Sequence, residues 1–246
     1  MLQQTKGITL RVTNYSESSV VAQIYTETLG LQSYLINGAK KPKAKINYNM
    51  LQPFHILEMV VYNKENNNLQ RIKEAHQIPP LKSIPLNIVK SSIAMFLNEV
   101  LYKVLKHQHP EPQLFQFLEN AIIWLDETDD GLANYHLVFL AKLSHYLGFK
   151  PIISNQPYFD LMEGQFSNHL PAHFHVLQEP YSSALREILQ SSFSNCNKIK
   201  LNRADRTYLL QKLIDYYRLH TENFGEVNSL YILEEIFGNK PHEKTR

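Results

Sequence analysis

The sequence has a single cysteine, Cys196, among its 246 residues. One thiol forms no internal disulfide and no cysteine-rich zinc site, and this scarcity is typical of a reducing cytosol. No stretch approaches the ~20 apolar residues that span a bilayer, and the amino-terminal residues lack the apolar core of a signal peptide. We therefore expect a soluble cytoplasmic protein with no membrane partner.

The short motifs of common enzymes are also absent: GxSxG, the P-loop, dinucleotide glycines and HExxH do not occur. We therefore expect no catalysis and no cofactor. The acidic residues Asp126, Glu127, Asp129 and Asp130 have the composition of a two-metal nuclease site. They fall between two predicted helices with no basic or histidine partner nearby, which favours a solvated turn. A hydrolase that uses this turn is the alternative from the enzyme class.

Three histidines, His169, His173 and His175, lie close together in the sequence around Pro171. Imidazole nitrogens are good metal ligands, although this spacing fits no familiar zinc pattern. No metal site is predicted, and whether these histidines bind a metal stays open.

Negative charge is scarce at the amino-terminal end. The net charge is only +2, but residues 1–80 carry nine Lys and Arg against five Asp and Glu, and residues 81–110 carry four against one. Residues 111–180 carry two against nine, and residues 181–246 carry ten against eight. Anion binding must come from this local asymmetry, so the amino-terminal part is the part expected to face anions.

The first 80 residues alternate with period two between closely spaced turn signals, which predicts a small all-β unit. The five expected strands are Gly7–Val12, Ser19–Thr26, Leu31–Asn37, Gln52–Tyr62 and Leu69–Ile78. Five short strands, with the longest connection between the third and fourth, favour an OB-fold barrel. A five-stranded SH3-like barrel is the main competitor.

Pro79 and Pro80 end this unit, and the apolar period then changes to 3.6, which predicts helices. Ser83 is the expected N-cap of the first helix. The later helices are expected at 113–125, 132–147, from about 182, from Asn202 as N-cap with Asp205, and at 227–237. Residues 149–180 predict an irregular insert with a hairpin. The expected class is α+β, with an OB-fold domain at 1–80 and a helical domain at 81–246.

The loop between the third and fourth strands carries four lysines in six positions: Lys40, Lys41, Lys43 and Lys45. Pro42 keeps them off a regular helix, and lysines are almost never fully buried, so they are expected to project into solvent. An ordinary solvated turn would look the same. Concentrated positive charge on a β-barrel, however, suits a phosphate backbone.

Barrels that bind single strands combine such charge with exposed rings on which bases stack. At least half of Tyr15, Tyr25, Tyr34 and Tyr48 are expected in the barrel core or as cross-strand partners rather than as base platforms, because aromatic residues are ordinary strand formers. Tyr48 lies in the loop and is the preferred ring. The predicted DNA-binding residues are Arg11, Lys40, Lys41, Lys43, Lys45, Tyr48 and Arg71. Lys6 adds further charge.

The chain resembles the RecO family of bacterial recombination mediators over nearly its whole length. The resemblance is carried by short segments that are fairly specific in this order: Gly7-Ile8, Leu10-Arg11, Tyr15-Ser16-Glu17, Tyr25-Thr26, Gly30, Gly38-Ala39-Lys40-Lys41, Lys45, Leu51-Gln52-Pro53-Phe54, Asn98-Glu99-Val100-Leu101, Leu147-Gly148-Phe149-Lys150-Pro151 and Ser229-Leu230. It implies an amino-terminal OB-fold, a helical domain and an insert at 149–180. Many members have four zinc-binding cysteines in that insert, and this chain has none there.

The resemblance implies a non-catalytic factor in DNA repair that acts in the bacterial cytoplasm at the nucleoid. Proteins like it bind single- and double-stranded DNA and anneal complementary strands. They associate with RecR and with the acidic C-terminal tail of single-stranded DNA-binding protein, so that RecA can load. Lys142 is the only Lys or Arg within residues 111–146 and is the candidate to meet that tail. An OB-fold module for structured RNA or a protein partner is the alternative function.

Overall fold

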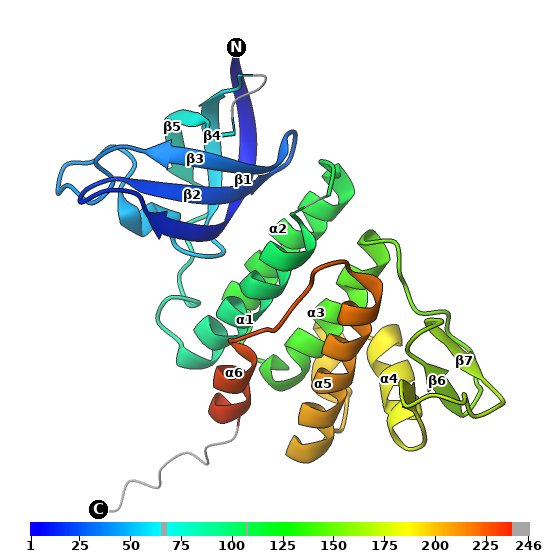
Figure 1. Ribbon diagram of the computed structural model, residues 1–246. Helices are drawn as coiled ribbons and strands as arrows, with labels where there is room; N and C mark the ends of the chain where they lie inside the picture. The colour runs from blue at the N-terminus through cyan, green and yellow to red at the C-terminus, as the bar shows by residue number, and fades with distance from the viewer. Residues whose placement is uncertain (65–67, 107, 238–246) are drawn as a thin grey trace, which may run out of the picture. The chain divides into compact units, whose positions relative to one another are not determined.

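The computed structural model describes residues 1–64, 68–106 and 108–237. Their elements form an α+β fold in which a five-stranded antiparallel sheet precedes the helices (Figure 1). The strands are β1 (Leu2–Asn14), β2 (Val20–Thr26), β3 (Gly30–Ile36), β4 (Ile56–Tyr62) and β5 (Arg71–Gln77). The predicted fold class and number of strands in this sheet are confirmed.

The sheet has the strand order β3-β2-β1-β4-β5. It is not closed along its length, but Tyr34 on β3 and Gln70 before β5 form a parallel bridge between the two edge strands. The Leu35 N–H donates to Gln70 O at 3.0 Å, and the Gln70 N–H donates to Ser33 O at 2.8 Å. The result is the barrel-like arrangement of an OB-fold.

Alternate residues of the strands point inward and make the core of the sheet. Ala22, Ile24, Leu57 and Val61 are among the side chains buried there. Full burial of a Val, Leu or Ile contributes about 1.5–3 kcal/mol relative to exposure. The period-two pattern predicted the strands because each alternate side chain faces this core.

Two helices follow the sheet, α1 (Ile88–Val104) and α2 (Pro112–Glu127). Both pack against it: Asn98 of α1 donates to Leu10 O, and Phe115 of α2 stacks on Tyr25 at 6.2 Å between ring centroids. The predicted N-cap at Ser83 is wrong, because Asn87 caps α1 by accepting from the backbone N–H groups of residues 89 and 90.

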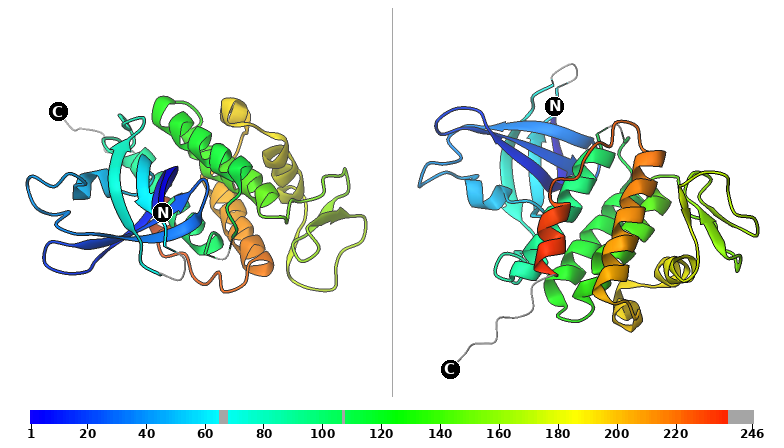
Figure 2. Two further views of the ribbon diagram at one scale, coloured as in Figure 1. Left: turned by 90° about the horizontal axis from the view of Figure 1, so that it is seen from above. Right: turned by 60° about the horizontal axis from the view of Figure 1, so that its bottom comes forward.

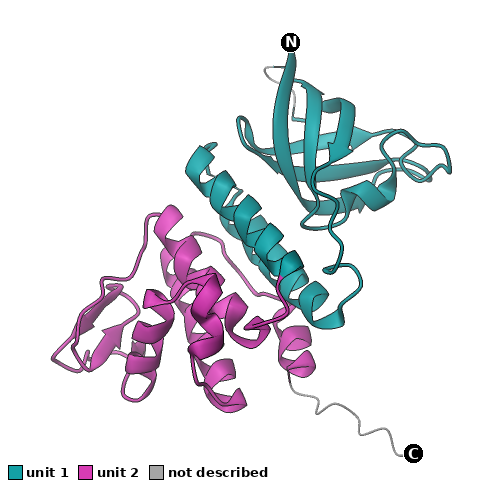
Figure 3. Ribbon diagram, turned by 180° about the vertical axis from the view of Figure 1, so that it is seen from behind, with its two compact units in different colours: residues 1–127 teal, residues 128–246 magenta. Residues whose placement is uncertain are grey.

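The described chain forms two compact units, Met1–Glu127 and the residues from Thr128 onward (Figure 3). The first unit contains the sheet with α1 and α2, because both helices contact β-strand residues. The domain division at residue 80 stays a prediction.

The second unit contains α3 (Leu132–Tyr146), α4 (Tyr181–Gln190), α5 (Arg203–His220) and α6 (Leu230–Ile236). Helix α3 packs against α4 and α5 (Figure 2). Asn202 caps α5 by accepting from the Asp205 N–H at 2.9 Å, as predicted. The last helix begins three residues later than expected, and the 3₁₀ helix Phe193–Lys198 was not predicted.

The insert between α3 and α4 contains three short strands, β6 (Tyr158–Asp160), β7 (Gln165–Ser167) and β8 (Val176–Leu177). The predicted hairpin is formed by β6 and β7, on which Phe159 and Phe166 are opposite each other at 4.9 Å between ring centroids. Within the described residues, no helix is long and apolar enough to cross a membrane.

Candidate nucleic-acid interface

The lysine loop, residues 37–47 between β3 and β4, is anchored at both ends. Ala39 and Ile46 are buried in the core of the sheet. The Tyr48 N–H donates to Ala39 O at 2.9 Å, and the Lys40 N–H donates to Ser18 O at 3.1 Å. Gly38 has a φ of +66°, which favours glycine. The chain is therefore held to the sheet while its lysine side chains are free to turn outward.

The four lysines of this loop are all exposed, as predicted. Lys40, Lys41, Lys43 and Lys45 form no ion pair with a carboxylate anywhere in the described part of the chain. Figure 1 shows the connection between β3 and β4 projecting from one end of the sheet. Unpaired ammonium groups in this position are available to phosphates.

A shallow groove runs from the end of the lysine loop to β5. Its lining includes Lys45, Ile46, Tyr62, Arg71 and Lys73. Two residues predicted from different segments, Lys45 and Arg71, are thus brought to one site. Lys73 was not predicted as part of it, and its partner Glu74 lies 3.3 Å away in an exposed ion pair.

A second groove continues from the first, because both include Tyr62 and Arg71. It is lined further by Lys64, Leu69 and Gln70. The side chain of Gln70 fixes the chain at Lys64, whose N–H donates to Oε1 at 3.1 Å and whose carbonyl accepts from Nε2 at 2.9 Å. The two grooves make a positive path past the start of β5.

Tyr62 is the ring that sequence reasoning missed. It is 41% exposed at the end of β4 and lines both grooves. Its position at the last residue of an expected strand, next to a turn, was the available signal. A base could stack on it while Lys45 and Arg71 contact phosphates.

The four tyrosines divide as expected. Tyr25 and Tyr34 are fully buried, whereas Tyr15 is 62% and Tyr48 is 39% exposed. Burial raises the pKa of both Tyr25 and Tyr34, so these phenols stay neutral. Tyr48 begins the 3₁₀ helix Tyr48–Leu51, which Asn47 caps by accepting from the Met50 N–H at 3.1 Å. The preferred ring is thus exposed beside the lysine loop.

Two cations of the sheet lie outside the grooves. Arg11 on β1 donates to the Tyr102 hydroxyl of α1 at 3.4 Å, and neither residue lines either groove. Lys6 forms an ion pair with Glu119 of α2 at 2.7 Å. Hydrogen bonding to Glu119 raises the pKa of Lys6 against the effect of burial. The charge of Lys6 is therefore used within the fold.

The acidic turn differs from its prediction at Asp126. Its carboxylate is buried and accepts from the backbone N–H groups of Lys82, Ser83 and Ile84, each at 2.8 Å. The ammonium group of Lys90 donates to the Asp126 carbonyl at 3.0 Å. Asp126 is thus neither solvated nor without a basic neighbour. It fixes the connection between the sheet and α1.

The three histidines do not meet at one point. His173 Nε2 lies 3.2 Å from Asp160 Oδ2 of β6, and its ring is 6.2 Å from that of His175 between centroids. Over the residues that the structure describes, no three or more His, Cys, Asp or Glu are grouped so that they could hold a metal ion.

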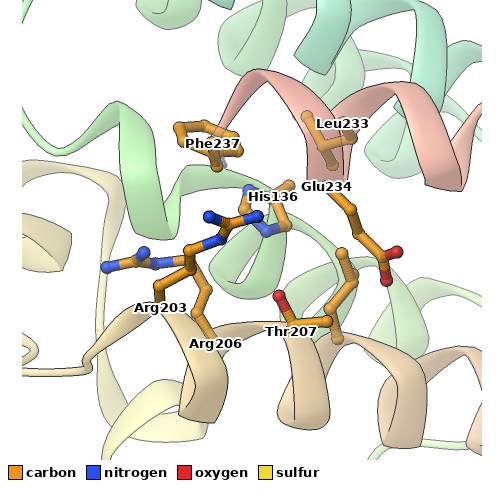
Figure 4. A pocket seen from close by; sticks show the side chains of 8 residues that line it. His136, Arg203, Arg206, Thr207, Leu233, Glu234 and Phe237 are labelled. Carbon is orange, nitrogen blue, oxygen red and sulfur yellow. The ribbon is translucent and has the colours of Figure 1, made fainter. Parts of the chain in front are cut away.

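The second unit contains a narrow pocket beside α5. Arg203 and Arg206 of α5 line this pocket together with His136 of α3 and with Phe237, which stacks on His136 at 5.5 Å between centroids (Figure 4). Arg206 donates to Asn134 Oδ1 and to the Leu201 carbonyl, both at 3.0 Å. Burial, and then the charge of Arg206, lower the pKa of His136 to about 3. The imidazole is therefore neutral at physiological pH.

Lys142, the predicted protein-binding residue, does not line this pocket. It is half-buried on α3, and burial together with the positive charge of Lys150 lowers its pKa. Lys142 and Lys150 therefore act as a pair of neighbouring positive charges in the second unit.

Comparison with known proteins gives consistent matches over both units. Residues 1–80 match the family described as "Recombination protein O N terminal", and residues 85–227 match "Recombination protein O C terminal". The chain is 34% identical over 241 residues to the DNA repair protein RecO of Bacteroides fragilis, covering 96% of this chain and 100% of that protein. It is 36% identical over 240 residues to that of Flavobacterium psychrophilum, covering 95% and 98%.

Proposed function

Because this chain belongs to the RecO family of DNA repair proteins, we propose that it is a non-catalytic recombination mediator that binds single- and double-stranded DNA. The observation that carries the proposal is the positive path formed by the exposed lysine loop and the two grooves at the start of β5. Family membership gives the role in repair, and this surface supplies the means to bind a polyanion.

The lysine loop and Arg71 contact phosphates in this proposal, while Tyr48 and Tyr62 provide faces for bases. Phosphate contacts release counterions and give affinity without sequence preference. Each stacked base contributes about 1–3 kcal/mol, and every base has a face that can stack. Such a surface binds strands of any sequence, which a repair factor requires.

Annealing follows from the same physics. A positive surface reduces the repulsion between two strands and raises their local concentration, so no covalent step is needed. The protein would work in the bacterial cytoplasm at the nucleoid, with RecR as a partner. It would engage the acidic C-terminal tail of single-stranded DNA-binding protein so that RecA can load. Lys142 and Lys150 are the cations proposed to meet that tail.

The proposal is tested by a salt titration of binding to fluorescently labelled single-stranded DNA. Changing Lys40, Lys41, Lys43 and Lys45 to Gln removes up to four phosphate contacts. We expect weaker binding and a log-log salt slope that is shallower by about 3, since each contact on a single strand contributes about 0.7. The lysines are exposed, so circular dichroism should show an unchanged fold.

The control is the double variant Lys198→Gln/Lys200→Gln, which removes two exposed charges of the second unit. It should leave the slope unchanged. Equal slopes for the wild type and the loop variant would contradict the proposal. A structured RNA hairpin that outcompetes single-stranded DNA for the wild type would favour an RNA-binding module instead.

A further inference from the structure

We propose that Arg11, Tyr102 and Lys106 form a second phosphate-binding site, separate from the lysine loop, which holds the second DNA strand during annealing. The inference rests on the proposed function and extends it to a part of the first unit that neither groove includes. We call these three residues the Tyr102 site.

Two cations from different elements meet at one ring in this site. The guanidinium carbon of Arg11, on β1, is 5.2 Å from the centroid of the Tyr102 ring on α1. The ammonium nitrogen of Lys106, just after α1, is 4.8 Å from the same centroid. Arg11 Nη1 also donates to the Tyr102 hydroxyl at 3.4 Å. Strand and helix are packed together here, so the cations converge on a fixed support.

No carboxylate neutralises this pair within the described residues. The nearby Glu99 of α1 lies 3.7 Å from Lys103, and no ion pair joins a carboxylate to Arg11 or Lys106. Two positive charges held together without an anion repel each other, and an added phosphate would remove that repulsion. Arg11 and Lys106 are both exposed, so a strand can reach them.

The electrostatics of Tyr102 agree with this geometry. Burial acts to raise its pKa, but hydrogen bonds from Arg11 and Gln23 and the charge of Lys106 hold the pKa below its ordinary value. The same two cations would attract a phosphate oxygen placed beside them.

Separate sites matter for annealing because one positive path occupied by one strand would repel a second. With the first strand on the lysine loop and β5 grooves, the Tyr102 site offers compensating charge for another strand. We therefore expect one protein molecule to bind two strands at once, even when the strands do not pair with each other.

The test uses donor- and acceptor-labelled oligothymidylates, which cannot pair, and measures energy transfer when both bind the protein. The double variant Arg11→Gln/Lys106→Gln should bind the first strand with near-normal affinity. We expect this variant to lose most of the energy transfer, because two phosphate contacts of the second strand are gone. For the same reason its rate of annealing complementary oligonucleotides should fall by about tenfold. The control Lys198→Gln/Lys200→Gln removes equal charge from exposed positions of the second unit and should behave as the wild type.

The results of these experiments distinguish a failure of the second phosphate-binding site from a failure of the proposed function. Unchanged energy transfer and annealing in the Arg11→Gln/Lys106→Gln variant would overturn the second site and leave the proposed function standing. Loss of first-strand affinity as large as in the lysine-loop variant would overturn it too, because that would indicate one continuous site. A lysine-loop variant that binds and anneals like the wild type would overturn the proposed function itself.

Discussion

Buried polar side chains hold the first unit together at the point where the sheet leads into α1. The Lys90 ammonium donates to Ser83 Oγ at 2.7 Å and to the Asp126 carbonyl, and the Asp126 carboxylate accepts three backbone N–H groups. Lys90 is only 1% exposed. Buried charges are tolerated when their hydrogen bonds are made, so these residues are a structural requirement of the unit.

We expect Asp126→Asn to destabilise the protein by about 2–4 kcal/mol in denaturant unfolding at pH 7, since charge-assisted hydrogen bonds contribute about 1.5–3 kcal/mol and an amide nitrogen cannot accept. Burial opposes ionisation, but the N–H groups of Ile84, Lys82 and Ser83, with the charge of Lys90, hold the pKa of Asp126 below its ordinary value. This stabilisation is present above the unfolded-state pKa and is lost as pH falls through the lower folded-state pKa.

Asp130→Asn is the matched control, because Asp130 lies in the same acidic turn and is exposed. It should change the free energy of unfolding by less than about 0.5 kcal/mol. Equal stability of the two variants would mean that the Asp126 hydrogen bonds are not important. DNA binding by both folded variants should match the wild type. A nuclease activity that is lost on changing Asp126 would instead support the alternative that the acidic turn is a hydrolase site.

The insert shows how an element can be held together by apolar side chains. Phe159 is 1% exposed, contacts Phe166 and lies 5.9 Å from the Tyr216 ring of α5 between centroids. Arg186 of α4 lies over Phe166 at 4.7 Å and donates to the carbonyls of residues 154 and 156, both at 2.7 Å. These contacts join the strands of the insert to α4 and α5.

Phe159→Ala should therefore destabilise the second unit by about 3–5 kcal/mol, the usual cost of removing a buried aromatic ring. Thermal unfolding followed by circular dichroism measures the effect, and a metal chelator should leave the wild-type midpoint unchanged. Phe174→Ala is the control within the same insert, because Phe174 is 97% exposed. Similar losses in both variants, or a midpoint lowered by the chelator, would contradict this account.

Elements with a regular apolar period were predicted well, and contacts between distant residues were not. The five strands of the sheet followed from period two, yet β4 begins at Ile56 rather than at residue 52, because a capped 3₁₀ helix precedes it. The hydrogen bonds of Asp126 link residues more than 40 positions apart, which no local pattern indicates. The lysine loop was visible in the sequence, whereas the inclusion of Tyr62 and Lys73 in the grooves depends on how the strands pair.

Over the whole molecule, a small net charge conceals a strong separation of sign along the chain. Residues 1–110 contain thirteen Lys and Arg against six Asp and Glu, whereas residues 111–180 contain two against nine. DNA binding by the first unit should therefore depend strongly on salt although the net charge is only +2. The nine acidic residues of 111–180 repel an acidic peptide, so we expect its binding in that segment to depend on the two lysines there.

Lys142 and Lys150 are the two cations of that segment, and we expect the double variant Lys142→Gln/Lys150→Gln to bind an acidic-aromatic C-terminal tail peptide about fivefold more weakly. The physical reason is the loss of about 1 kcal/mol from two partly exposed charge contacts, which salt also screens. Fluorescence anisotropy of a labelled peptide at two salt concentrations measures the change. The Lys198→Gln/Lys200→Gln variant should bind the peptide normally. An unaltered affinity after loss of Lys142 and Lys150 would move the tail site elsewhere in the chain.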